Sequence, residues 1–136
     1  MWGKIHRGTD LKLAWNNDDT KLATTGDFEI TIWSMGSAGT FEWQSTIRDV
    51  KGYVYFVAWN NDGTKLATGG YGGGITILCP SDTFDAYFLH GHSDYVRCAC
   101  FSPDGSKLSS CSDDSTVRIW NLITRECVST YEHSYW

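Results

Sequence analysis

The sequence has little proline, no long apolar run and no cluster of basic residues. Its two prolines leave the turns largely to Gly, Asn and Asp. No apolar stretch approaches the roughly 18 residues that a membrane-spanning helix requires, and Met1–Arg7 has no apolar region typical of a secretory signal. The net charge is −5, with no run of Lys and Arg of the kind that binds nucleic-acid phosphates. We therefore expect neither a membrane nor a nucleic acid among its partners.

Cysteine forms no disulfide framework, because its number is odd and its spacing is irregular. Without a signal segment, we expect reduced thiols that pack as small apolar side chains in a cytoplasmic protein, with the nucleus as the alternative. His90 and His92 lie near three cysteines and raise the hypothesis of a zinc site. Structural zinc sites usually place two or more residues between paired cysteines, whereas Cys98 and Cys100 have one, so we expect no metal and no cofactor. The cysteines are Cys79, Cys98, Cys100, Cys111 and Cys127.

The chain repeats itself three times. A segment of the type Asp-x-Thr/Ser-Lys-Leu occurs within 17–26, 61–70 and, more loosely, 103–112. Lys21 precedes Lys65 by 44 residues, and Lys65 precedes Lys107 by 42. A period of about 40–45 residues is typical of the four-stranded blades of a β-propeller.

The composition and the turns agree with a β structure. The chain has seven Trp and seven Tyr, and aromatic residues are enriched in strands. In every repeat an Asp-Gly or Asp-Asp pair separates two short apolar runs, and these residues tolerate the positive φ of a tight hairpin turn. No segment of ten or more residues has a helical period. The sequence therefore predicts an all-β protein.

The third repeat carries a family signature. It contains Gly91-His92 at its start and Trp120-Asn121 at its end, and it resembles the repeats of the WD-repeat family. Asn121 departs from the Asp that is usual in this family. The resemblance implies a β-propeller with blades of four antiparallel strands, three of them in this chain. The expected blades span about 9–48, 52–90 and 94–133, and residues 2–7 form a separate outer strand.

The resemblance also implies a buried hydrogen-bonding network that ties the strands of a blade together. A buried imidazole needs a polar partner, and a Trp N–H needs an acceptor. The second repeat keeps Thr68 but has Gly72 and Leu78 where Asp and Trp are usual, so we expect the middle blade to be the least stable. The complete tetrad is expected at His92, Ser110, Asp114 and Trp120, and a partial one at Thr24, Asp27 and Trp33.

Three blades are too few for a closed propeller, which usually has about four to eight. The segment Trp2–Arg7 lies 42 residues before the outer strand around Ile47 and matches an outer strand without a blade of its own. One interpretation is a part of a longer propeller. The other is a complete half whose second copy, or another chain, closes the ring; the additional strand favours the first interpretation.

Propellers of this family bind partners mainly where the loops before the innermost strands meet. Tyr and Arg are enriched at binding hot spots because they combine large contact area with a polar group. We therefore expect the residues at these loop positions to bind partners. The alternative is that the tyrosines are exposed strand residues without a partner. These residues are Tyr53, Tyr71, Tyr95, Arg97 and Asp113.

The sequence favours a binding protein over an enzyme. It has no nucleophile motif, phosphate loop or cofactor fingerprint, and the Ser, His and Asp of the third repeat are expected in the buried tetrad. We expect a protein-interaction scaffold that binds peptides or subunits on the propeller face. The alternative is a structural subunit that assembles with itself into a closed ring.

Overall fold

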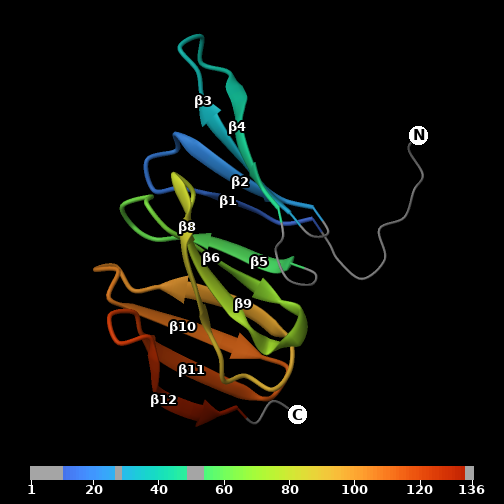
Figure 1. Ribbon diagram of the computed structural model, residues 1–136, viewed down its shortest axis with the longest axis vertical. Coiled ribbons are helices and arrows are strands. Elements are labelled where there is room, and N and C mark those ends of the chain that lie inside the picture. Colours follow the sequence, from blue (N-terminus) through green and yellow to red (C-terminus); the bar gives the residue numbers. More distant parts are fainter. Residues whose placement is uncertain (1–10, 27–28, 49–53, 134–136) are drawn as a thin grey trace, which may run out of the picture.

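The computed structural model describes residues 11–26, 29–48 and 54–133 of the chain (Figure 1). Within these ranges the strands form three four-stranded antiparallel sheets, each made of consecutive strands. The sheets lie one after another along the long axis of the molecule (Figure 1). The all-β prediction is confirmed, and we refer to the three sheets as blades 1, 2 and 3.

Blade 1 contains the strand order β1-β2-β3-β4. Its strands are β1 (Leu13–Trp15), β2 (Lys21–Thr25), β3 (Ile30–Met35) and β4 (Phe41–Ile47). The alternation of buried and partly buried residues along β2 and β3 follows from the opposite directions of successive side chains in a strand.

Blade 2 contains β5 (Val54–Trp59), β6 (Leu66–Gly70), β7 (Ile75–Cys79) and β8 (Asp82–Leu89). A single 3-10 turn, η1 (Tyr71–Gly73), joins β6 to β7. It is the only helical element in the described part of the chain, where no helix is long and apolar enough to cross a membrane.

Blade 3 contains β9 (Val96–Phe101), β10 (Lys107–Ser112), β11 (Thr116–Asn121) and β12 (Glu126–Glu132). Its strands pair in the order in which they follow along the chain. The innermost strands of the three blades, β1, β5 and β9, lie next to one another.

The repeated Asp-x-Thr/Ser segment forms the same turn in every blade. One carboxylate oxygen accepts hydrogen bonds from the backbone N–H and the hydroxyl two residues later. The residue between them has a positive φ of 64° at Asp19, 74° at Gly63 and 75° at Gly105. In the third blade, the backbone N–H and hydroxyl of Ser106 lower the pKa of Asp104 to about 2. The motif recurs because it closes the hairpin on which each blade depends.

The core lies between the blades and not within one blade. A first cluster joins Ile30 and Ile32 of blade 1 to Leu66 and Leu78 of blade 2. A second joins blade 2 to blade 3 and includes Trp120, which is almost fully buried. Each sheet thus buries its apolar side chains only because a neighbouring sheet covers them, as expected of stacked repeats.

Some sequence predictions fall outside the described residues. They concern the separate outer strand at Trp2–Arg7 and the site residues Asp27 and Tyr53.

Candidate functional site

The tetrad residues of blade 3 form one hydrogen-bonded chain. The ring of His92 has its Nδ1 2.9 Å from Asp114 Oδ2 and its Nε2 2.8 Å from Ser110 Oγ. Trp120 donates its indole N–H to the same hydroxyl, over 2.9 Å. The network therefore links the two middle strands of the blade, β10 and β11, to the segment before its innermost strand β9.

Asp114 is the charged end of this chain. Burial by itself raises the pKa of the Asp114 carboxyl group. Its hydrogen bonds have the larger effect, so the pKa is lowered; they come from the Thr116 hydroxyl, the Ser93 backbone N–H and the His92 ring. The Oδ1 atom accepts from both the N–H and the hydroxyl of Thr116, over 2.9 and 2.6 Å. The carboxylate therefore remains ionised and fully hydrogen-bonded.

Ser, His and Asp in one chain are also the groups of a hydrolase triad. Here Ser110 is 2% exposed, and its hydroxyl contacts both the His92 ring and the Trp120 N–H. A substrate carbonyl has no access to a hydroxyl buried in this way, whereas nucleophilic catalysis requires that access. We call the network of His92, Ser110, Asp114 and Trp120 the clamp, because its geometry suits a structural role.

The other two blades keep parts of the clamp. In blade 1 the indole N–H of Trp33 donates to Thr24 Oγ1 over 2.9 Å, as Trp120 does to Ser110 in blade 3. In blade 2 the hydroxyl of Thr68 donates to the backbone carbonyl of Phe56 over 3.0 Å. In blade 2, Thr68 therefore links only β5 and β6.

A second group of side chains gathers where blades 2 and 3 meet. We call Tyr55, Tyr95, Arg97 and Asp113 the Tyr–Arg cluster. The Arg97 guanidinium carbon lies 4.9 Å from the ring centre of Tyr55 and 5.6 Å from that of Tyr95. The two rings meet edge to face, with their centres 5.3 Å apart. The Arg97 and Asp113 side chains are 51% and 38% exposed to solvent.

Asp113 holds Arg97 in place. Its two carboxylate oxygens accept from Nε and Nη2 of Arg97 over 2.9 and 2.6 Å. The hydrogen bonds from Arg97 lower the pKa of Asp113, and those to Asp113 raise the pKa of Arg97. The backbone N–H of Asp113 also donates to the carbonyl of Tyr95 over 2.9 Å. A bidentate pair of this kind is rigid and directional.

The structure thus brings Tyr95, Arg97 and Asp113 together. Tyr53 lies outside the described residues, and for Tyr71 only the backbone is described, in η1. Sequence reasoning missed Tyr55, which takes the place next to Arg97. The signal was available, because Tyr55 precedes Arg97 by 42 residues, which is the repeat period between blades 2 and 3.

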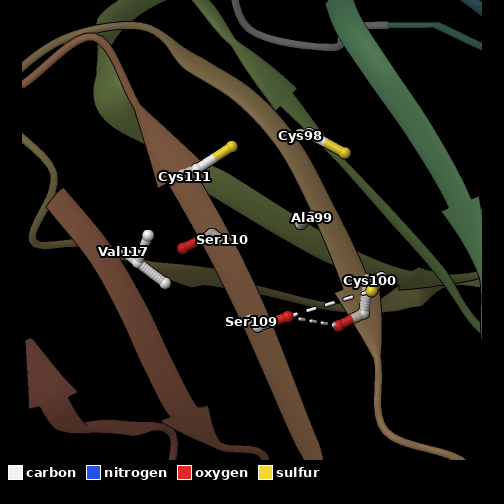
Figure 2. A pocket seen from close by; sticks show the side chains of 7 residues that line it. All are labelled: Cys98, Ala99, Cys100, Ser109, Ser110, Cys111 and Val117. Carbon is white, nitrogen blue, oxygen red and sulfur yellow. Dashed lines mark hydrogen bonds between the residues drawn. The ribbon is translucent and has the colours of Figure 1, made fainter. Parts of the chain in front are cut away.

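Blade 3 carries a shallow, mainly apolar depression on the face opposite to the one that packs on blade 2 (Figure 2). Cys98 faces Cys111 across the β9–β10 ladder, and Cys100 faces Ser109. Burial raises the pKa of Cys111, so this thiol is not activated as a nucleophile. In the described ranges, no three His, Cys, Asp or Glu side chains are placed to hold a metal ion.

The stacked four-stranded sheets and the His–Ser–Trp clamp define a protein of the β-propeller class. The model of the WD domain, G-beta repeat, matches residues 44–77 and 85–121, together more than half of the chain. The chain belongs to the WD-repeat family, as the signature of its third repeat predicted.

The chain is also similar to curated proteins. Ribosome biogenesis protein BOP1 is 45% identical over 53 residues in Rattus norvegicus and 47% identical over 53 residues in Homo sapiens. The homolog in Drosophila virilis is 40% identical over 55 residues. These matches cover 39–40% of this chain and 7% of each relative. The chain thus matches only a small part of the length of these relatives.

Solved structures show the same arrangement over most of the chain. The crystal structure of the RRP9 WD40 repeats matches with a TM-score of 0.78 and 26% identity, and the structure of U3-55K matches with 0.79 and 26%. Both comparisons cover 89% of this chain and 38% of the solved chain. The fold and family are therefore established, and a WD-repeat scaffold agrees with a role in protein interaction.

Proposed function

We propose that this chain is a protein-interaction scaffold that holds a segment of a partner protein on the Tyr–Arg cluster. The observation that carries the proposal is the placement of Arg97, which is rigid yet half exposed between two tyrosine rings. Rigid aromatic and Arg side chains lose little entropy on binding, and they dominate binding hot spots. No catalytic role is assigned to the chain.

The chemistry of the cluster favours a particular kind of segment. Asp113 engages Nε and Nη2 of Arg97, and among the described residues Nη1 donates to no acceptor. A carboxylate or a backbone carbonyl of the partner would accept from it, while the rings of Tyr55 and Tyr95 contact an adjacent apolar side chain. The partner segment would therefore combine an acceptor group with an apolar residue.

Selection of peptides from a displayed random library tests this function. The selected peptides should bind the wild-type chain and lose at least about tenfold in affinity with Arg97→Ala or Tyr95→Ala, which corresponds to a hot-spot loss of ~1.4 kcal/mol. The matched control is Tyr131→Ala, a tyrosine on the outer strand β12 that is 59% exposed. Equal binding by all variants would place the interaction elsewhere on the molecule.

The names of the matched relatives support a role in ribosome assembly. They are ribosome biogenesis proteins, and a function of that kind would place this chain in the nucleus, the alternative to the cytoplasm that the sequence left open. With 11 basic against 16 acidic residues, we favour proteins over RNA as its direct partners. A fluorescent fusion concentrated in the cytoplasm, with none in the nucleus, would contradict this assignment.

A further inference from the structure

The turn that joins β11 to β12 contains an arginine in a strained backbone conformation. Arg125 has a φ of 65°, in the left-handed region that residues with long side chains rarely adopt. The corresponding turn of blade 1, between β3 and β4, uses Gly39 for its positive φ of 81°. Glycine adopts this conformation without steric cost, so the turn itself does not require arginine. Strain of this kind is concentrated at functional sites, which makes the Arg125 side chain a candidate for a functional role.

The Arg125 side chain packs on blade 2. Its guanidinium carbon lies 3.8 Å from the ring centre of Tyr87 in β8, closer than Arg97 lies to either of its tyrosine rings. The Tyr87 ring packs against the core between blades 2 and 3, and its hydroxyl donates to the backbone carbonyl of Leu122 over 3.4 Å. A guanidinium stacked on a ring that is itself held by the core is well positioned before any partner binds. We call Tyr87, Ile123 and Arg125 the turn site.

Asn121 fixes the backbone of this turn. Its side-chain oxygen accepts from the backbone N–H groups of Ile123 and Thr124 over 2.8 and 3.0 Å. Its backbone carbonyl accepts from the N–H of Arg125 over 2.7 Å. Asn121 stands where Asp is usual in this family. An aspartate accepts the same hydrogen bonds but adds a negative charge four residues before Arg125, whereas asparagine adds none.

The Arg125 guanidinium has no acceptor among the residues that the structure describes. By contrast, Nη1 of Arg48 lies 3.7 Å from Oε2 of Glu29. Arg97 likewise donates two hydrogen bonds to Asp113. Stacking on an aromatic ring uses the face of a guanidinium and leaves its N–H groups available at the edge. A carboxylate can accept two of these N–H groups at once, so Arg125 is suited to a carboxylate from outside the chain.

An exposed apolar side chain accompanies this arginine in the turn. Ile123 is 83% exposed and precedes Arg125 by two residues. Residues 37–40, in the corresponding turn of blade 1, are exposed as well, although blade 2 packs against that blade. A following blade therefore does not cover a turn of this kind. The turn site combines one cation with one apolar side chain at the junction of blades 2 and 3.

We propose that the turn site binds an acidic segment of a partner protein, in which an Asp or Glu carboxylate pairs with Arg125 and an adjacent apolar side chain contacts Ile123. The site is separate from the Tyr–Arg cluster, because Asp113 precedes β11 whereas the turn follows the other end of that strand. A single cation on a chain of net charge −5 suits one carboxylate better than a nucleic acid, whose binding requires clustered basic residues.

Selection of displayed random peptides on the Arg97→Ala variant tests the turn site. This variant lacks the central side chain of the Tyr–Arg cluster, so the outcome is independent of the function proposed for that cluster. Peptides that remain after counter-selection against the double variant Arg97→Ala, Arg125→Gln should be enriched in Asp or Glu next to an apolar residue. Recovery of no such peptides, or of peptides without acidic enrichment, would overturn the proposal.

Substitutions within the turn separate a lost site from a lost fold. Arg125→Gly should weaken binding of the selected peptides at least about tenfold without unfolding the chain, because glycine accepts the positive φ as Gly39 does in blade 1. The matched control is Arg48→Gln, at an exposed arginine that already has a carboxylate partner, and it should bind with unchanged affinity. Equal binding by Arg125→Gly and Arg48→Gln would contradict the assignment.

The charge of the bound group is tested from both sides. Asn121→Asp retains the acceptor of the turn and adds a competing carboxylate, so it should lower peptide affinity roughly two- to fivefold, as expected for one exposed charge pair. Peptides with Asn and Gln in place of Asp and Glu should not bind. Unchanged affinity in either test would overturn the carboxylate contact. Displacement of the peptide by a single-stranded RNA oligonucleotide would assign the site to phosphate groups and would equally overturn the proposal.

Discussion

At the scale of single residues, the side chains of the clamp matter through their hydrogen bonds. Ser110 accepts from Trp120, and the ring of His92 joins Ser110 to Asp114. These groups are buried or nearly so, and a buried polar group that loses its partner costs about 1–3 kcal/mol. Replacements in the clamp should therefore act on stability.

Trp120→Ala should lower the free energy of unfolding by about 3–5 kcal/mol, as for other buried aromatic residues. The change removes the indole from the core between blades 2 and 3 and leaves Ser110 without one hydrogen bond. Leu78→Ala, at the equivalent position of blade 2, should cost less because the side chain is smaller. Urea unfolding of both variants measures the loss in free energy of unfolding. Equal or reversed losses would contradict the expectation that the network of blade 3 contributes more to stability than its counterpart in blade 2.

Asp114→Asn should destabilise the chain by about 1–3 kcal/mol at neutral pH, because an amide cannot accept the same set of hydrogen bonds. The folded-state pKa of Asp114 is lowered, so its contribution is present above the unfolded pKa of about 4 and is lost as pH falls below it. The stability difference between wild type and variant should shrink from pH 6 to pH 3. Denaturant titrations across this range measure it, and a difference that grows toward low pH would be inconsistent with an ionised Asp114.

At the scale of elements, the η1 turn brings blade 2 against blade 3. Gly73 has a φ of +78°, and a Cβ placed there would lie 2.3 Å from the carbonyl oxygen of His92. Gly72 has a φ of +83° but open space around its Cβ position. The close approach of Gly73 to the His92 carbonyl therefore requires the absence of a side chain at this position.

Gly73→Ala should therefore destabilise the chain more than Gly72→Ala. Both substitutions impose a positive φ on alanine, which costs roughly 1–2 kcal/mol. Gly73→Ala adds a steric clash with the segment that positions His92, for which a further cost of about 1–3 kcal/mol is typical. Thermal unfolding of the two variants provides the comparison, and similar melting temperatures would show that the segment yields without cost.

At the scale of the whole molecule, stability depends on how the blades cover one another. Blade 2 lies between the other two blades (Figure 1), and it contributes side chains to both apolar clusters. Each cluster therefore depends on the packing of two blades, as expected of stacked repeats.

The sequence by itself determined the repeat, the turn and the family. The Asp-x-Thr/Ser turn is local, since each carboxylate bonds to groups two residues away, and the period follows from the length of four short strands. The tetrad residues stood at family positions in the sequence, and the structure brings His92, Ser110 and Trp120 within hydrogen-bond distance.

Tertiary structure decided which surfaces are open and which side chains meet across blades. Tyr55 joins Arg97 because blades 2 and 3 pack against each other, and Gly73 approaches the His92 carbonyl for the same reason. Trp15 and Trp59 occupy equivalent positions in the repeat, yet one is exposed and the other packs against its neighbour. Burial in a stacked repeat depends on the adjacent blade, and no pattern within a single blade encodes whether that neighbour is present.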